Sequence, residues 1–140
     1  MAAFTGTVYH AMDAKNRIRI PAKFRTGLGK EYSFIIGSQG CIAVYPQAVM
    51  DERVEKLNDI HSGDPKLLAA KRKILSSIEQ LQEDEQGRTL LPASFRQAAG
   101  IKKEVVTIGM GNYIEIWAKE VYDKANEELS MDEALALVDF

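Results

Sequence analysis

The chain contains an internal repeat. Shifting the sequence by 71 positions aligns residues 13–29 with residues 84–100, and seven of the seventeen aligned positions are identical. A shift of 72 then aligns residues 42–45 with residues 114–117, which places one inserted residue between the two blocks. This repeat predicts two copies of one structural unit that share a core, because a chain of only 140 residues usually forms one compact domain.

Each repeat begins with residues that are typical of a tight turn. Asp13 and Asp84 can accept hydrogen bonds from free backbone N–H groups. Three residues after each aspartate, Asn16 and Gly87 tolerate the positive φ that closes a hairpin. We therefore expect these four residues to shape two hairpin loops.

A strand and a short helix are predicted after each loop. In residues 18–20 apolar and charged side chains alternate, as in a half-buried strand. Pro21 and Pro92 suit the first position of a helix, and after about two turns a glycine ends it, at Gly29 and Gly100.

A second hairpin is predicted later in each repeat. Residues 32–36 and 41–45 are apolar runs on either side of a glycine-containing turn, and residues 105–108 and 113–117 repeat this arrangement.

The segments outside the repeats are predicted to be helical. Residues 47–60 follow Pro46 and place apolar side chains on one face, and residues 66–81 place them at spacings of three and four. The acidic stretch from Lys119 predicts a third helix, frayed beyond Ser130.

These elements predict an α+β, mainly β, fold class. We expect residues 1–140 to form a single domain. Its parts are repeat 1 at about residues 5–46, a helical connection at 47–82, repeat 2 at about 83–118 and a C-terminal helix at 119–138.

Charge is distributed unevenly along the chain. The formal net charge is −2, yet residues 1–30 carry six Lys or Arg side chains against one acid, Asp13. Acidic residues are concentrated at the other end, from Glu115 to Asp139. Because phosphate attraction is screened over about 8 to 10 Å, a locally basic surface can bind nucleic acid even on an acidic protein.

The sequence carries no pattern typical of an enzyme. His10 and His61 are the only histidines, and they have no partner at metal-ligand spacing. Cys41 is the only cysteine and is expected in the core, and no Gly-rich phosphate loop or nucleophile elbow is present. We therefore expect no catalytic residue, no cofactor, no metal and no small-molecule substrate.

The sequence also favours a cytoplasmic protein without membrane contact. The N-terminus lacks the basic start and the unbroken apolar stretch of a signal peptide. The longest uncharged stretch, residues 32–50, is interrupted by polar residues and is too polar to cross a bilayer. A single cysteine fits a reducing compartment.

Three motifs together resemble the MraZ family. Residues 13–25 have the pattern Asp-x-Lys-[Asn/Gly]-Arg-[hydrophobic]-x-Ile-Pro-Ala-Lys-Phe-Arg, and residues 84–92 repeat it as Asp-x-x-Gly-Arg-x-Leu-x-Pro. A closing Ile-Glu-Ile-Trp stands at residues 114–117. The resemblance covers nearly the whole chain, in order.

The resemblance implies a fold, a function and partners. The implied fold is a pair of pseudo-symmetric halves of the AbrB-like (SpoVT-AbrB) swapped-hairpin type that share one barrel-like core. The implied function is regulation of transcription, as repressor or activator, by binding repeated boxes of double-stranded DNA upstream of the division and cell-wall gene cluster. The implied assembly is a ring-like homo-oligomer associated with the nucleoid.

The resemblance also implies which residues meet DNA. In the family the Asp-x-x-x-Arg loop contacts DNA, so the implied DNA-binding residues are Lys15, Arg17 and Arg19 in the first copy and Gln86 and Arg88 in the second. Three acids at residues 83–85 surround the second loop, so we expect the first loop to make most contacts. The alternative is that each arginine only forms a salt bridge that stabilises its turn.

Other residues keep two interpretations. For Arg25 and Arg96 we favour an ion pair or a helix-end contact, with a phosphate contact as the alternative. Residues 71–73, Lys-Arg-Lys, are expected on a solvated helix face, with a second DNA contact as the alternative. Four aromatic residues are expected in the core or at subunit contacts: Phe24, Tyr45, Phe95 and Trp117.

A competing hypothesis assigns the chain to another class. In it the protein is an oligomeric scaffold or sequestering protein for a protein partner, bound by its acidic C-terminal helix, and its DNA affinity is incidental.

Overall fold

The computed structural model describes residues 3–61 and 63–140, and its main element is an antiparallel sheet of six strands in the order β1-β7-β8-β4-β3-β5. The strands are β1 (Thr7–Ala11), β3 (Glu31–Ile36), β4 (Ile42–Pro46), β5 (Glu79–Gln82), β7 (Glu104–Gly109) and β8 (Ile114–Ala118). Among the described residues, β1 and β5 are the two edges of this sheet, so the expected barrel-like core is not a closed barrel.

The two repeats exchange strands. The first strand of repeat 1, β1, pairs with β7 of repeat 2. β5 lies at the end of the expected helical connection, in the place that corresponds to β1 at the shift of 71, and it pairs with β3 of repeat 1. Two further strands, β2 (Arg17–Arg19) and β6 (Arg88–Leu90), form a separate antiparallel ribbon across the repeats. β4 also pairs with β8. Each repeat therefore completes the sheet of the other.

The strand exchange changes the expected hairpins at residues 13–17 and 84–88. Each of these turns joins a strand of the six-stranded sheet to a strand of the ribbon, so the prediction that the turns close hairpins is wrong. The hydrogen bonds within each turn are as expected. The strands on either side of each turn, however, pair with strands of the other repeat. The later hairpins, β3 with β4 and β7 with β8, are confirmed.

Two short helices occupy equivalent places in the repeats, as predicted. Helices α1 (Ala22–Leu28) and α4 (Ala93–Ala99) each begin directly after a proline and end at a glycine with positive φ. They bury Phe24 and Phe95, whose side chains point into the core.

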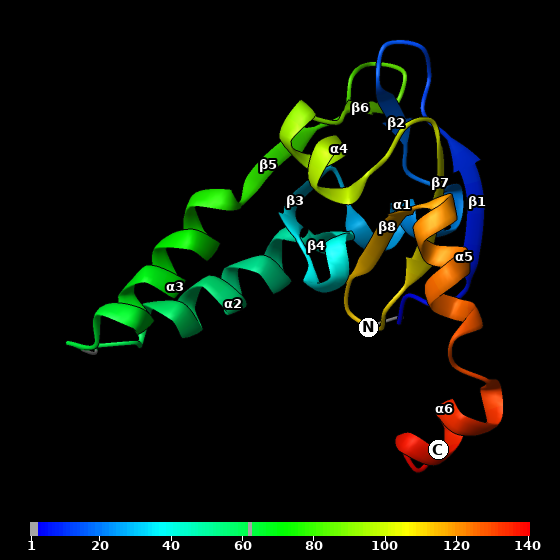
Figure 1. Cartoon of the computed structure of the whole chain (residues 1–140). Helices are drawn as coiled ribbons and strands as arrows, with labels where there is room; N and C mark the ends of the chain where they lie inside the picture. Colours follow the sequence, from blue (N-terminus) through cyan, green and yellow to red (C-terminus); the bar gives the residue numbers. More distant parts are fainter. Residues whose placement is uncertain (1–2, 62) are drawn as a thin grey trace.

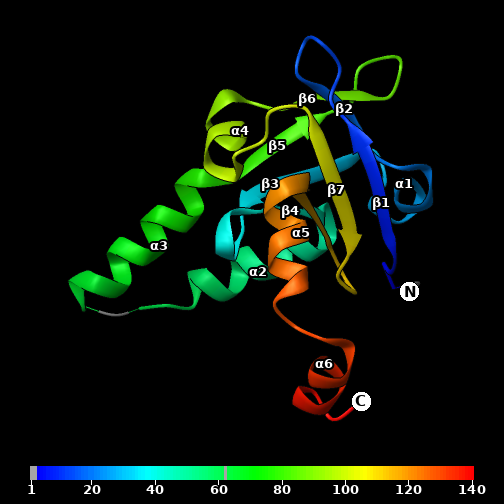
Figure 2. The same cartoon turned by 45° about the vertical axis from the view of Figure 1, so that its right-hand side comes forward.

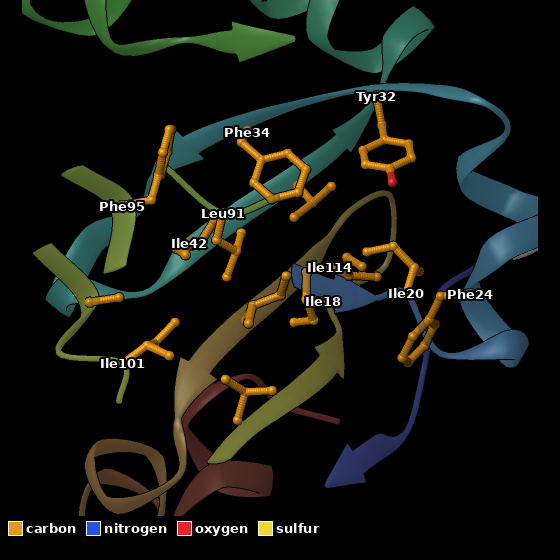
Figure 3. Close-up of a cluster of buried hydrophobic side chains, with 14 of the residues drawn as sticks. Ile18, Ile20, Phe24, Tyr32, Phe34, Ile42, Leu91, Phe95, Ile101 and Ile114 are labelled. Atoms are coloured by element: carbon orange, nitrogen blue, oxygen red, sulfur yellow. The ribbon is translucent and has the colours of Figure 1, made fainter. Parts of the chain in front are cut away.

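The core is built by both repeats. One cluster of buried side chains includes Ile18, Phe24 and Phe34 from repeat 1 and Leu91 and Ile114 from repeat 2, and Figure 3 shows these side chains converging between the sheet and the short helices. Also buried, as expected, are the side chains of Cys41, Tyr45, Phe95 and Trp117.

Two helices between the repeats form an arm that projects from the sheet (Figure 1). They are α2 (Gln47–Asn58) and α3 (Pro65–Ser77). The predicted helix over residues 66–81 is too long, because Glu79–Gln82 leaves the helix and pairs with Glu31–Phe34 as β5. The apolar spacing of three and four continues into Leu81, but backbone pairing with an open sheet edge determines its conformation.

The C-terminal segment forms two helices, α5 (Lys119–Glu127) and α6 (Met131–Leu137), instead of the one predicted for residues 119–138. A capping box starts α6: the Ser130 side chain accepts from the Glu133 N–H, and the Glu133 carboxylate accepts from the Ser130 N–H. The segment beyond Ser130, which we expected to be frayed, is therefore a capped helix.

None of the helices in residues 3–61 and 63–140 is both long enough and apolar enough to cross a membrane.

Candidate nucleic-acid interface

The two Asp-x-x-x-Arg turns lie next to each other at one end of the molecule. Figures 1 and 2 both show them as neighbouring loops, one between β1 and β2 and one between β5 and β6. The β2–β6 ribbon at their base determines their spacing, with Arg17 opposite Leu90 and Arg19 opposite Arg88.

The first turn is closed by backbone hydrogen bonds. The Asp13 N–H donates to the Arg17 carbonyl at 2.9 Å, and the Asn16 N–H donates to the Asp13 carbonyl at 3.1 Å. Asn16 has a φ of 62°, in the left-handed region that asparagine adopts more readily than most residues. The chain therefore reverses within a few residues.

The Asp13 carboxylate stabilises this turn by accepting hydrogen bonds from residues within it. Its Oδ1 accepts from the Lys15 and Arg17 N–H groups, both at 2.9 Å, and its Oδ2 accepts from Arg17 Nε at 2.7 Å. The backbone N–H of Arg17, followed by its side chain and the Lys15 N–H, holds the pKa of Asp13 below the ordinary aspartate value.

The second turn has the same bonds. Asp84 Oδ1 accepts from the Gln86 and Arg88 N–H groups at 2.9 Å, and Oδ2 accepts from Arg88 Nε at 2.9 Å. Gly87, with a φ of 76°, stands where Asn16 stands in the first turn. The Arg88 N–H is the main cause that lowers the pKa of Asp84.

The ribbon has one buried and one outward face. Ile18 and Thr89 are buried, and the alternate residues, Arg17, Arg19 and Arg88, lie on the opposite face with the exposed Leu90. Lys15 and Gln86, in the turns themselves, are exposed. All five residues for which DNA contact is expected therefore lie in the ribbon or its turns.

The salt bridges that formed the alternative interpretation are present in both turns. Each uses the Nε of the arginine, and both arginine side chains remain 25% exposed. Within the described residues, the two terminal nitrogens of Arg17 and of Arg88 donate no hydrogen bond to protein. Each guanidinium is thus oriented by its aspartate and keeps a pair of donors for another acceptor.

Arg25 supports the second turn, a contact that local sequence patterns do not indicate. Its Nη2 donates to Glu83 Oε2 at 2.8 Å, and its Nη1 donates to the Gly87 carbonyl at 3.3 Å. This ion pair offsets one of the acids beside the second turn. The repeat-related Arg96 instead donates from Nε to the Leu91 carbonyl at 3.1 Å, because Met12 stands where repeat 2 has Glu83.

A buried pair of hydroxyl groups joins the ribbon to the main sheet. The Tyr32 hydroxyl on β3 and Thr89 Oγ1 on β6 lie 2.7 Å apart and share a hydrogen bond. Burial raises the pKa of Tyr32 to about 12. This pair holds the inner face of the ribbon in place.

Other polar candidates lie outside this region. Residues 71–73 are on α3 in the arm, where two of the three side chains are exposed. His10 Nε2 lies 2.7 Å from Thr107 Oγ1, and burial lowers its pKa. In the described part of the chain no three His, Cys, Asp or Glu side chains are grouped so that they could hold a metal ion.

Comparison with known proteins places this arrangement in a family. A family model described as "MraZ protein, putative antitoxin-like" matches residues 3–72 and 74–137. A relative in Lachnoclostridium phytofermentans is 37% identical over 130 residues, which cover 93% of this chain and 91% of the relative. A relative in Symbiobacterium thermophilum is 39% identical over 123 residues, covering 88% and 89%.

A third relative, in Heliobacterium modesticaldum, is 37% identical over 140 residues and covers 98% of each chain. All three relatives are named as transcriptional regulators. The chain belongs to the MraZ family, which confirms the resemblance seen in the motifs.

Proposed function

We propose that the chain is a transcriptional regulator that binds double-stranded DNA through the β2–β6 ribbon and its two turns. The observation that carries this proposal is the pairing of β2 with β6, which gathers Arg17, Arg19 and Arg88 on one outward face between the turns. Membership of a family whose named relatives are transcriptional regulators supports it.

The turns supply the chemistry of base recognition. A turn carrying Lys and Arg can enter the major groove, where a guanidinium with two free donors can bind guanine N7 and O6 together. Asp13 orients Arg17 for such a contact, and the exposed Lys15 can reach a phosphate. Each good base contact contributes roughly 1 to 3 kcal/mol of discrimination.

One copy presents too few contacts to specify a promoter, so we propose a ring-like homo-oligomer that binds repeated boxes. Several subunits holding several turns raise the avidity without any new type of contact. The boxes are proposed to lie upstream of the division and cell-wall gene cluster, which places the protein in the cytoplasm at the nucleoid. The exchange of β1 and β5 supports an AbrB-like, pseudo-symmetric pair of halves.

The scaffold hypothesis is the second candidate, and the exposed apolar residues of α6 favour it. It proposes that the ring holds a protein partner and that DNA binding is incidental. Neither candidate gives the chain a catalytic role.

A titration with the DNA upstream of the protein's own gene, run beside a scrambled duplex at several salt concentrations, tests the proposal. The slope of log affinity against log salt measures the number of phosphate contacts, and the ratio between the duplexes measures specificity. We expect a preference for the upstream DNA that is lost in Arg17→Ala and kept in Lys124→Ala, a matched loss of charge at an exposed position of α5 outside the ribbon. Equally weak binding to both duplexes would favour the scaffold.

A further inference from the structure

Helix α6 carries an apolar stripe that the chain itself leaves uncovered. Met131, Ala134, Leu135 and Val138 follow the spacing that places side chains on one helix face. Met131 is 72% exposed and Phe140, just beyond the helix, is 96% exposed, and no residue of Met131–Leu137 is buried. The capping box nevertheless starts this helix at a defined residue, so an ordered apolar surface faces solvent.

The arm contains an apolar groove of about 380 Å³ between α2, α3 and the sheet. Leu57 and Ile60 line it from the α2 side, and Ile74 and Ile78 line it from the α3 side. Arg53 and Lys56 are the charged residues in its lining. The groove therefore offers an apolar floor with a cationic edge.

The charges of the two surfaces are complementary. Residues 125–140 contain five acidic side chains and no Lys or Arg. Helix α3 contains Lys66 and the basic residues 71–73 and no acidic residue, and it forms one wall of the groove. The acids of α2, at residues 51, 52 and 55, do not line the groove. An acidic helix with an apolar stripe matches this groove in both polarity and charge.

The position of α6 favours the groove of another copy over the groove of the same chain. Helix α5 packs against β7 and β8, and only residues 128–130 connect it to α6. Three residues extend the chain by at most about 11 Å. Both views show the arm and α6 leaving the sheet in different directions (Figures 1 and 2).

We infer that α6 and the residues that follow it dock into the α2–α3 groove of a second copy of this chain. The inference rests on the self-assembly in the proposed function and names the surfaces that form it. The contact is head-to-tail, because the tail of one copy meets the groove of the next. A contact of this kind closes into a ring when its rotation allows, and otherwise extends as a filament.

Paired substitutions in the full-length chain test the inference without DNA. Leu135→Asp places a charge in the apolar stripe, and Ala136→Asp makes the same charge change on another face of α6. Ile74→Asp places a charge in the groove, and Leu67→Asp does so at an exposed position of α3 outside the groove lining. Circular dichroism checks folding, and light scattering after gel filtration measures the molar mass.

We expect the unmodified chain and both controls to assemble, and Leu135→Asp and Ile74→Asp each to run at the mass of one chain. Mixing these two variants must give a species of twice that mass that grows no further, because the intact tail of Ile74→Asp fits the intact groove of Leu135→Asp. A single-chain mass for the unmodified protein, assembly of Leu135→Asp equal to that of Ala136→Asp, or a mixture without the heterodimer would overturn the inference. Binding of Leu135→Asp to a duplex that carries a single box tests DNA binding by the ribbon separately from assembly.

Discussion

Arg19 on β2 lies directly opposite Arg88 on β6. Like charges at facing positions of paired strands destabilise the pair, and here both side chains are on the outward face of the ribbon. The strand register places the two residues opposite each other, and Asp84, which pairs with Arg88 at 2.9 Å, offsets part of their repulsion. An anion such as a phosphate that binds between the two side chains would reduce the repulsion further. The two facing cations therefore lower the stability of the ribbon and favour the binding of a phosphate.

Substituting Arg19 should weaken DNA binding without lowering the stability of the fold. Arg19→Leu gives the first repeat the residue that the second repeat has at Leu90, and it removes one of the facing charges. We expect the free energy of unfolding to stay equal or rise by roughly a few tenths of a kcal/mol. We also expect the salt dependence of DNA binding to fall by about one phosphate contact. Urea unfolding and salt titration measure the two effects, and a large loss of stability would contradict this account.

The two turns should contribute unequally to DNA binding. Arg17 and Arg88 have the same bonds and the same exposure, so the difference must come from their surroundings, where acids lie beside the second turn. We expect Arg17→Ala to weaken specific binding by roughly 5- to 150-fold and Arg88→Ala by less. A fluorescence anisotropy titration measures both. An equal or larger loss for Arg88→Ala would refute the assignment.

The turn aspartates should make stability depend on pH in acid. Their pKa values are held below the ordinary value of about 3.9, so their ionised forms add stability above about pH 4, and this is lost as the pH falls through the lowered pKa. The double variant Asp13→Asn, Asp84→Asn should be less stable than the unmodified chain at neutral pH, and the difference should shrink in acid. Urea unfolding between about pH 7 and pH 2.5 measures it, with Asp51→Asn, outside both turns and outside the groove lining, as the control. A difference that does not change with pH would show that ionisation of these groups adds no stability.

Arg25 should act on stability more than on binding. Arg25→Ala removes the ion pair with Glu83 and the bond to the Gly87 carbonyl, and its partial exposure limits the expected loss to about 1 kcal/mol. Urea unfolding measures the loss, and Arg96→Ala is the repeat-related control. If Arg25→Ala instead lowers the salt slope of DNA binding at unchanged stability, the phosphate-contact interpretation of Arg25 is correct.

The Tyr32–Thr89 pair should show coupling in a double-mutant cycle. Thr89→Val keeps the shape of the side chain but leaves the Tyr32 hydroxyl with only its longer 3.5 Å bond to Glu83 Oε1, which should destabilise the protein by about 1 kcal/mol. In the double variant with Tyr32→Phe both hydroxyls are gone, so we expect a loss smaller than the sum of the single losses. Additive losses would mean that the two hydroxyls stabilise the fold independently.

The elements that follow local rules could be predicted from the sequence. Proline and glycine mark the limits of α1 and α4, and the apolar runs on either side of glycine turns predict the hairpins β3–β4 and β7–β8. The hydrogen bonds inside each turn could also be predicted, because Asp13 and Arg17 are only four residues apart.

Features that depend on distant partners could not be predicted from local patterns, and the resemblance implied swapped hairpins without giving the partner of any strand. Residues 79–82 continue the helical spacing of α3, and only the edge of β3 makes them a strand. The pairing of β2 with β6 and the ion pair of Arg25 with Glu83 join residues of different repeats, for which the sequence carries no local signal. The start of α6, in contrast, has a local signal, because Glu133 follows Ser130 at capping-box spacing.

In the proposed DNA complex, the exchange of β1 and β5 limits the spacings between contacts that one chain can make. Each repeat supplies an edge strand to the other, so the gap between the two turns within one chain cannot widen or narrow unless the sheet comes apart. In the proposed ring, tolerance for boxes at different separations would therefore arise at the contacts between subunits, because the distance between the two turns of one chain is fixed.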